Sequence, residues 1–186
     1  MRSGAPAVVA VWDLPLRIHH WALAASVLIA WASANVLDTV HEVAGYTVIG
    51  LIAFRVVWGI FGSRHSRFAS LPRLLRAMPR YLLQITRRQT GRYLGLNPAG
   101  AAMAVALLVL LAISTISGWM QVTERFFGVA WVETVHTYSS NVVLILVAVH
   151  VLGVLLMCAL QKENLVRAMI TGNKRARRSE DGPGPR

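Results

Sequence analysis

Two histidines in a long uncharged stretch constrain the fold of this chain more than any other feature. His136 and His150 lie fourteen residues apart within residues 134–161, a stretch without Asp, Glu, Lys or Arg. Fourteen helical residues make almost four turns and rise about 21 Å, so both imidazoles leave one face of one helix, near its two ends. Because ionisable groups are costly to bury in hydrocarbon, histidines inside a membrane helix indicate a functional site.

The apolar composition predicts one integral membrane domain. Of the 186 residues, 55% are hydrophobic and the mean hydropathy is +0.53, which is too apolar for a soluble protein of this size. A helix needs about twenty apolar residues to cross a bilayer. Four blocks meet this need, at 14–37, 43–61, 99–120 and 131–160. The expected fold class is therefore all-α, an integral membrane four-helix bundle.

The distribution of positive charge orients these spans. Of the 19 Lys and Arg residues, all except Arg125 lie in residues 1–17, in residues 55–92 or after residue 161. The positive-inside rule places these segments in the cytoplasm, so both termini are expected there. The net charge of +11 is then a topology signal. Nucleic-acid binding is not expected, because no basic patch is interleaved with stacking aromatic residues in a soluble module.

This topology sorts four histidines into two pairs by depth. His20 and His150 are expected near the inner surface, and His41 and His136 near the outer one. Two pairs of imidazoles are the ligand set of two bis-histidine haems. The chain has no C-x-x-C-H sequence and a single cysteine, Cys158, so any haem would be held without a covalent bond.

Three further polar residues keep two interpretations each. Arg55 follows His41 by fourteen residues, hence on the same helix face and about 21 Å deeper, where it could pair with haem propionates or extend to the inner interface. His19 points about 100° away from His20, and periodicity does not choose between them as ligand. His65 lies among arginines, where contact with solvent or lipid headgroups is expected.

The chain outside the spans is basic. In residues 71–88, apolar side chains recur at three- and four-residue spacing among arginines, which predicts an amphipathic helix on an anionic leaflet. Pro72 and Pro79 leave a solvated basic loop as the alternative. The membrane domain is expected over residues 11–174. The charged end of the chain, which begins near Asn173 and includes residues 175–186, is expected to be a disordered tail.

Five segments carry a family resemblance. They are VWDLPLRIHHW at 11–21, HEVAGY at 41–46, FRVVWG at 54–59, GSRHSRF at 62–68 and ENLVRAMITG at 163–172. These segments resemble the bacterial cytochrome b561 family, which includes the b-type cytochrome subunits of nickel-iron hydrogenases. The similarity runs from about residue 11 to 174, and the spacing of His136 and His150 is its most specific part. In that family the first-helix ligand directly precedes a tryptophan, which assigns His20 and not His19.

The resemblance implies a protein of the bacterial inner membrane with two non-covalent, low-spin haem b groups. His20 and His150 would ligate the iron of the inner haem, and His41 and His136 that of the outer haem. Family members typically exchange electrons with the quinone pool and with a redox partner, such as a c-type cytochrome or an oxidoreductase subunit. The expected function is electron transfer between quinone and such a partner, and whether the chain is an enzyme in its own right stays open.

Three alternatives remain. Some relatives oxidise superoxide at the outer surface and reduce quinone, a reaction that a positively charged approach would assist, whereas Arg125 is the only basic residue expected there. A haem-free scaffold or carrier could bind a metal ion through the histidines, although it would need further ligands such as Glu42 or Glu133. The chain could also be a permanent subunit without turnover of its own.

Overall fold

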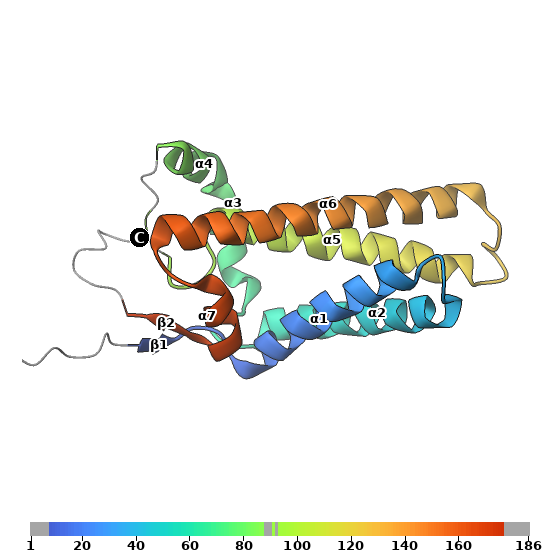
Figure 1. Cartoon of the computed structure of the whole chain (residues 1–186), viewed down its shortest axis with the longest axis horizontal. Helices are drawn as coiled ribbons and strands as arrows, with labels where there is room; N and C mark the ends of the chain where they lie inside the picture. The colour runs from blue at the N-terminus through green and yellow to red at the C-terminus, as the bar shows by residue number, and fades with distance from the viewer. Residues whose placement is uncertain (1–7, 88–90, 92, 177–186) are drawn as a thin grey trace, which may run out of the picture.

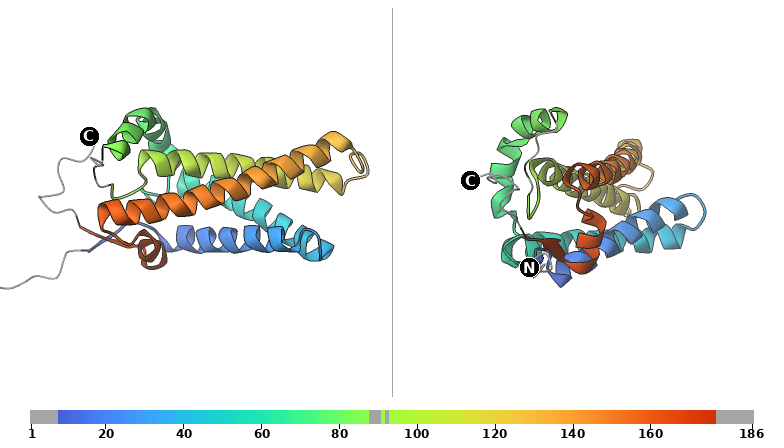
Figure 2. Two further views of the ribbon diagram at one scale, coloured as in Figure 1. Left: turned by 45° about the horizontal axis from the view of Figure 1, so that its top comes forward. Right: turned by 60° about the vertical axis from the view of Figure 1, so that its left-hand side comes forward.

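Four long helices lie alongside one another in the computed structural model, which describes residues 8–87, 91 and 93–176 (Figures 1 and 2). They are α1 (Leu14–Ser33), α2 (Asp38–Phe61), α5 (Pro98–Gln121) and α6 (Ala130–Gln161). The smaller elements gather at one end of these helices. They are β1 (Val8–Ala10), η1 (Phe68–Ser70), α3 (Leu71–Arg76), α4 (Met78–Thr86), α7 (Leu165–Thr171) and β2 (Asn173–Arg175). The predicted all-α fold class is confirmed, with one small two-stranded sheet added.

Three of the long helices in the described chain are long and apolar enough to cross a membrane, namely α2, α5 and α6. Only 11% of the most apolar window of α6 is buried within the protein, so most of its apolar surface needs lipid to cover it. The fourth helix, α1, runs antiparallel to α2 along the bundle. Its first two turns contain Arg17, His19 and His20, which lower its mean hydropathy.

The packing of the long helices is uneven. Helix α1 packs on α2, α5 packs on α6, and α2 packs on α5. Within the described residues, α6 does not pack closely along α1 or α2. The four helices meet at mid-height, where each contributes one buried residue to an apolar layer: Val27, Val48, Leu111 and Val143. We call these four residues the apolar layer.

Asp13 fixes the start of α1 against the end of α2. Its Oδ1 accepts hydrogen bonds from the backbone N–H of Leu16 at 2.8 Å, as an N-cap, and from Nε1 of Trp58 at 3.1 Å. Its Oδ2 accepts from the hydroxyls of Ser63 and Ser66. Burial raises the pKa of Asp13, but these four hydrogen bonds outweigh it and hold the pKa below its ordinary value of 3.8. The carboxylate therefore orients the helix that carries His19 and His20.

The connector between α2 and α5 forms two short helices, α3 and α4, instead of one amphipathic helix. Pro72 and Pro79 each occupy the first turn of one of them, because proline lacks the N–H that a helix interior requires. Tyr81 anchors α4: it is 1% exposed, and its hydroxyl donates to Sδ of Met157 on α6. The segment is thus helical and packs on the bundle through Tyr81. It is not the solvated loop that was the alternative prediction.

The two ends of the described chain lie side by side. β1 pairs antiparallel with β2, and Val8 is opposite Arg175. The expectation of a disordered tail from Asn173 is therefore wrong for Asn173–Arg175, and residues 177–186 lie outside the described residues. Glu163, which is 7% exposed, accepts a hydrogen bond from the backbone N–H of Arg175 and so ties β2 to the end of α6.

Candidate functional site

The structure brings the four sequence-selected histidines together as two pairs. The ring centroids of His20 on α1 and His150 on α6 are 6.3 Å apart, with an interplanar angle of 60°. Those of His41 on α2 and His136 on α6 are 6.0 Å apart, with an interplanar angle of 89°. Each pair joins α6 to a helix on which it does not pack closely.

The separation within each pair suits one metal ion between two imidazoles. Imidazole nitrogens bind metal ions at about 2.0 Å and lie about 1.1 Å from their ring centroid, so two rings on opposite sides of one ion have centroids about 6 Å apart. Both observed distances match this value.

Seven-residue spacing produces the arrangement. On α6, His136, Val143 and His150 follow one another at intervals of seven, and on α2, His41 is followed by Val48 at the same interval. Seven residues are almost two turns, so these side chains share one face, with about 10.5 Å between successive levels. The apolar layer, which contains both valines, therefore lies midway between the two histidine pairs.

Backbone carbonyls orient both rings of the pair formed by His41 and His136. Nδ1–H of His41 donates to the carbonyl oxygen of Ala30 at 2.7 Å, near the end of α1 where helix carbonyls lack N–H partners. Nδ1–H of His136 donates to the carbonyl oxygen of Ser114 on α5 at 2.8 Å. These bonds fix the tautomer and leave Nε2 of each ring as the free, metal-binding nitrogen.

Gly118 allows His136 to take this position. A Cβ at Gly118 would lie 2.9 Å from Cε1 and 3.0 Å from Nδ1 of the His136 ring, closer than carbon atoms normally approach. The imidazole thus rests on the backbone of α5 where only glycine leaves room. The adjacent Ser114 hydroxyl shares a 2.7 Å hydrogen bond with Ser140, which holds α5 and α6 together at this level.

His19 and His20 face different neighbours. His19 is 5% exposed; its Nε2–H donates to the carbonyl oxygen of Leu51 on α2 at 3.1 Å, and its ring stacks on Phe54. His20 lies opposite His150 instead. The structure therefore gives His19 a packing partner in α2 and leaves His20 for the pair, the choice that periodicity alone did not make.

Arg55 follows Val48 by seven residues on the same face of α2 as His41, toward the level of His20 and His150. Its guanidinium carbon is 4.4 Å from the ring centroid of Phe68, and its buried Nη1 has no hydrogen-bond partner in the described structure. Phe68 reaches this position because Gly59 has no side chain; a Cβ there would lie 2.2 Å from the Phe68 ring. An arginine with an unpaired buried donor suits an anionic group.

His65, the remaining histidine, is not part of either pair and lies against Gly95 in the chain between the second and third long helices. The Asp13 network and the contact of Gly118 with the ring of His136 were not predicted from the sequence. The sequence Asp-Leu-Pro is an N-cap signal that could have found the first. Gly118 had no local signal, because its role depends on a ring from another helix.

Within the described residues, no group of three or more His, Cys, Asp and Glu side chains could hold a metal ion. Glu42 and Glu133, the acids that a zinc or copper site would have needed, do not complete such a group. The donor set at each level is thus two imidazoles in the described chain, which suits an ion whose other ligands come with it, as in a porphyrin.

Comparison with known families agrees with this geometry. The model of the family described as prokaryotic cytochrome b561 matches residues 11–172. No significant match to the chain is found among curated proteins, nor among solved structures. The match includes both histidine pairs, Arg55 and the Asp13 network. The chain therefore belongs to the prokaryotic cytochrome b561 family, whose members are membrane b-type cytochromes that bind haem and carry electrons.

Proposed function

We propose that this protein binds two haem b groups and transfers electrons between the quinone pool and a redox partner in the bacterial inner membrane. The observation that carries the proposal is the presence of two separated imidazole pairs, each at the spacing of a bis-histidine metal site. A haem held by two imidazoles has no open iron position, which favours reversible one-electron transfer over oxygen binding. No C-x-x-C-H sequence is present, so attachment is non-covalent.

The residues take the following roles in this proposal. His20 and His150 ligate one haem iron, and His41 and His136 ligate the other. The carbonyls of Ala30 and Ser114 accept the Nδ1 protons and so raise the basicity of the second pair as ligands. Arg55, with its unpaired Nη1, binds a propionate of the haem between the first pair.

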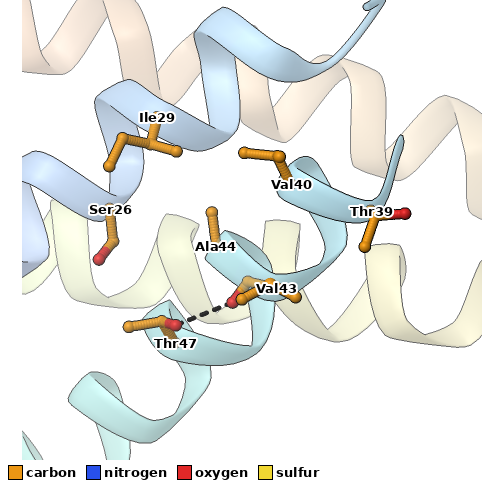
Figure 3. A pocket seen from close by; sticks show the side chains of 7 residues that line it. All are labelled: Ser26, Ile29, Thr39, Val40, Val43, Ala44 and Thr47. Atoms are coloured by element: carbon orange, nitrogen blue, oxygen red, sulfur yellow. Dashed lines mark hydrogen bonds between the residues drawn. The ribbon is translucent and has the colours of Figure 1, made fainter. Parts of the chain in front are cut away.

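A hollow beside His41 supports a quinone site near the outer haem (Figure 3). It has a volume of about 300 Å³; Ser26 and Ile29 come from α1, and the other lining residues from α2 are Thr39, Val40, Val43, Ala44 and Thr47. The lining is mostly apolar with three hydroxyl groups, a combination typical of sites for apolar ligands that carry a few polar atoms. The hydroxyl of Thr47 donates to the carbonyl of Val43, and that of Thr39 points away from the other lining side chains, which leaves the hydroxyl of Ser26 for a quinone carbonyl.

The orientation in the proposal follows from charge. The end with β1, β2, α3 and α4 carries most of the arginines and faces the cytoplasm under the positive-inside rule. A redox partner would then dock on the opposite end, at the turn between α5 and α6, where Phe127 is 80% exposed. At this end the guanidinium of Arg125 rests on the ring of Phe126, and one such cation gives little attraction for superoxide.

The test is a reduced-minus-oxidised absorption spectrum of the purified protein, with haem counted per chain. We expect b-type bands and two haems. His20→Ala and His150→Ala should remove the same spectral component, and His41→Ala and His136→Ala should remove the other. His19→Ala serves as the control, because its ring is bonded to α2, and it should retain both components. Loss of one component by both His20→Ala and His136→Ala would contradict the assigned pairs, and a haem-free protein would refute the proposal.

A further inference from the structure

A second hollow lies at the basic end of the molecule, between the first turns of α1 and helix α7, which run beside each other there (Figure 1). It has a volume of about 630 Å³. Its lining residues are Leu14, Arg17, Ile18, Trp21 and Ala22 from α1 with Met169 and Ile170 from α7. We call it the α1–α7 groove. It shares no lining residue with either histidine pair or with the hollow beside His41.

The walls of the α1–α7 groove are apolar and uncovered. The exposed fraction is 57% for Leu14, 60% for Ile18 and 59% for Ile170. Large apolar side chains gathered at one open site indicate a surface that something else covers. Trp21 also lines the groove and is 44% exposed. Tryptophan is enriched at the level of lipid headgroups, so the groove has the lining expected where acyl chains meet the interface.

Arg17 is the one cationic residue that lines the α1–α7 groove within the described chain. The guanidinium of Arg17 donates through Nη1 to the carbonyl oxygen of Ile170, which positions it against the end of α7. Its Nε is buried and has no hydrogen-bond partner in the described structure. No acid lines the groove. The nearest one along the helix, Asp13, already accepts four hydrogen bonds, so its carboxylate does not pair with Arg17.

We propose that the α1–α7 groove binds one anionic phospholipid from the surrounding membrane. The phosphate pairs with the terminal nitrogens of the Arg17 guanidinium, since Nε is buried and Nη1 gives only one of its protons to Ile170. An acyl chain covers Leu14, Ile18 and Ile170. Basic sites of this kind between helices at the cytoplasmic side of a membrane select anionic headgroups. The hollow beside His41, which has no charged lining residue, lacks this selectivity.

Such a lipid would hold α7 against α1, because its two parts contact both helices. Helix α7 is the element that leads into β2 and thus into the pairing of the two chain ends. A ligand that binds only the folded state stabilises it by an amount that grows with the logarithm of its concentration relative to Kd. Anionic lipid is therefore expected to stabilise the basic end of the protein specifically.

Native mass spectrometry of the full-length, haem-loaded protein tests the proposal by titration with phosphatidylglycerol or phosphatidylcholine of equal chain length. One cation near a headgroup gives about fivefold tighter binding, so the first phosphatidylglycerol should bind about fivefold more tightly than the first phosphatidylcholine. Arg17→Gln should abolish this preference. Ile18→Ser should weaken binding of both lipids while the preference remains. Inorganic phosphate, which has no acyl chain, should not compete.

Arg73→Gln is the matched control, since Arg73 is another arginine of the basic end and does not line the groove. It should leave the preference unchanged, and an unaltered haem spectrum should show that each variant is folded. Equal affinity for the two lipids in the unmutated protein would overturn the proposal, and this comparison needs no variant. If Arg73→Gln reduced the preference for phosphatidylglycerol as much as Arg17→Gln, the preference would come from general surface charge and the proposal would fail. If a short-chain quinone displaced the lipid, the groove would be a quinone site instead.

Discussion

A histidine ligand acts through both of its ring nitrogens, and the structure shows what the second nitrogen does. In His41 and His136, Nδ1–H is bonded to a backbone carbonyl. Because the acceptors are backbone carbonyls of Ala30 and Ser114, substitution of either side chain would not remove them. The helix backbones themselves therefore set the orientation of the two imidazole rings. Neither ring of the other pair, His20 and His150, has a comparable hydrogen bond in the described chain. The two proposed haem sites therefore differ in how firmly their ligands are held.

The first prediction at this scale concerns Gly118. We expect Gly118→Ala to push the ring of His136 away from α5, because the new Cβ would lie 2.9 Å from it. Overpacking of this kind typically costs about 1–3 kcal/mol. The spectral component that depends on His41 and His136 should decrease, while the one that depends on His20 and His150 should remain. The measurement is the haem content and difference spectrum of the purified variant.

Gly50→Ala is the control for this prediction. Gly50 is an exposed residue of α2, and a Cβ there meets no atom within 4 Å. Alanine is the better helix former, so this variant should be as stable as the unmutated protein or more so. An unchanged spectrum in Gly118→Ala would show that the ring of His136 has more room than the structure gives it.

Sequence reasoning reached the residues of the pairs but not all of their surroundings. The pairing of His20 with His150 and of His41 with His136 followed from depth alone, because charge orients the spans and helical rise sets the depth of each residue. The geometry now shows the rings of each pair with their centroids 6.3 and 6.0 Å apart, while their role as haem ligands stays a prediction. His19 and His20 could not be separated by periodicity, since neighbours on a helix differ by about 100° and either could face the bundle.

At the scale of secondary-structure elements, the sequence predicts the long helices, because each contains a long apolar block. It does not predict the shortest strands and helices, which have too few residues to show a periodic pattern. The two three-residue strands β1 and β2 have no periodicity to detect, and their pairing depends on contacts 163 to 167 residues apart in sequence. The connector was expected as one helix because its apolar spacing continues through Pro79, whereas the missing N–H of proline starts a new helix there. Helix α2 begins at Asp38, before the apolar block at 43–61, because helical geometry continues through the polar residues around His41.

The Asp13 network gives a prediction at this scale. Asp13→Asn should destabilise the protein by about 1.5–3 kcal/mol, the usual contribution of hydrogen bonds to a charged group. The pKa of Asp13 is lowered in the folded protein, so its stabilisation is fully present above 3.8 and is lost as the pH falls from there through the lower folded-state pKa. The difference in thermal midpoint between the two proteins should thus be constant near neutral pH and decrease in acid.

The exposed residue Glu124 provides the comparison for Asp13. Glu124→Gln removes one negative charge from the turn between α5 and α6, where no hydrogen bond to its side chain holds a helix end in the described structure. Its thermal midpoint should stay close to that of the unmutated protein. A pH-independent difference between Asp13→Asn and the unmutated protein would mean that the charge of Asp13 does not contribute.

The hollow between α1 and α2 gives the second prediction at this scale. Val40→Trp should fill it and slow haem reduction by quinol about tenfold, equivalent to about 1.4 kcal/mol of lost binding. Reduction by dithionite should be unaffected, because it does not need the hollow. Val56→Trp is the control, at an exposed position of the same helix that does not line the hollow. Equal effects of the two substitutions would place the quinone elsewhere.

At the scale of the whole molecule, the charge distribution predicts that both ends of the chain lie on one side of the membrane, and the fold brings the two ends of the described chain together. The pairing of Val8 with Arg175 places both ends of the described chain at one end of the long helices, as an even number of membrane crossings requires. This pairing supports a crossing by α1 despite its polar first turns. The sequence predicts four spans and their orientation, because lipid imposes a minimum length and the translocation of positive charge is disfavoured. Three helices of the described chain meet the length and hydropathy of a span, and the orientation stays a prediction.

The corresponding prediction is one of topology. A green fluorescent protein joined to the C-terminus should fluoresce, as it does in the cytoplasm. An alkaline phosphatase placed in the turn between α5 and α6 should be active, as it is outside the inner membrane. The opposite pattern would reverse the assigned depths, although the two histidine pairs would still exist. An inactive phosphatase together with a fluorescent C-terminus would show that α5 and α6 do not both cross.

The apolar layer has a consequence for energy conversion. Val27, Val48, Leu111 and Val143 have no side-chain group that can hydrogen-bond to water, and they form a buried apolar cluster between the two histidine levels. In the proposed cytochrome, electrons could tunnel between the two haems across the apolar layer. Protons could not cross it in the same way, because proton transfer needs a continuous chain of hydrogen-bonded water or polar groups. Each electron that crosses would therefore charge the membrane, and the voltage would not dissipate through the protein that generates it.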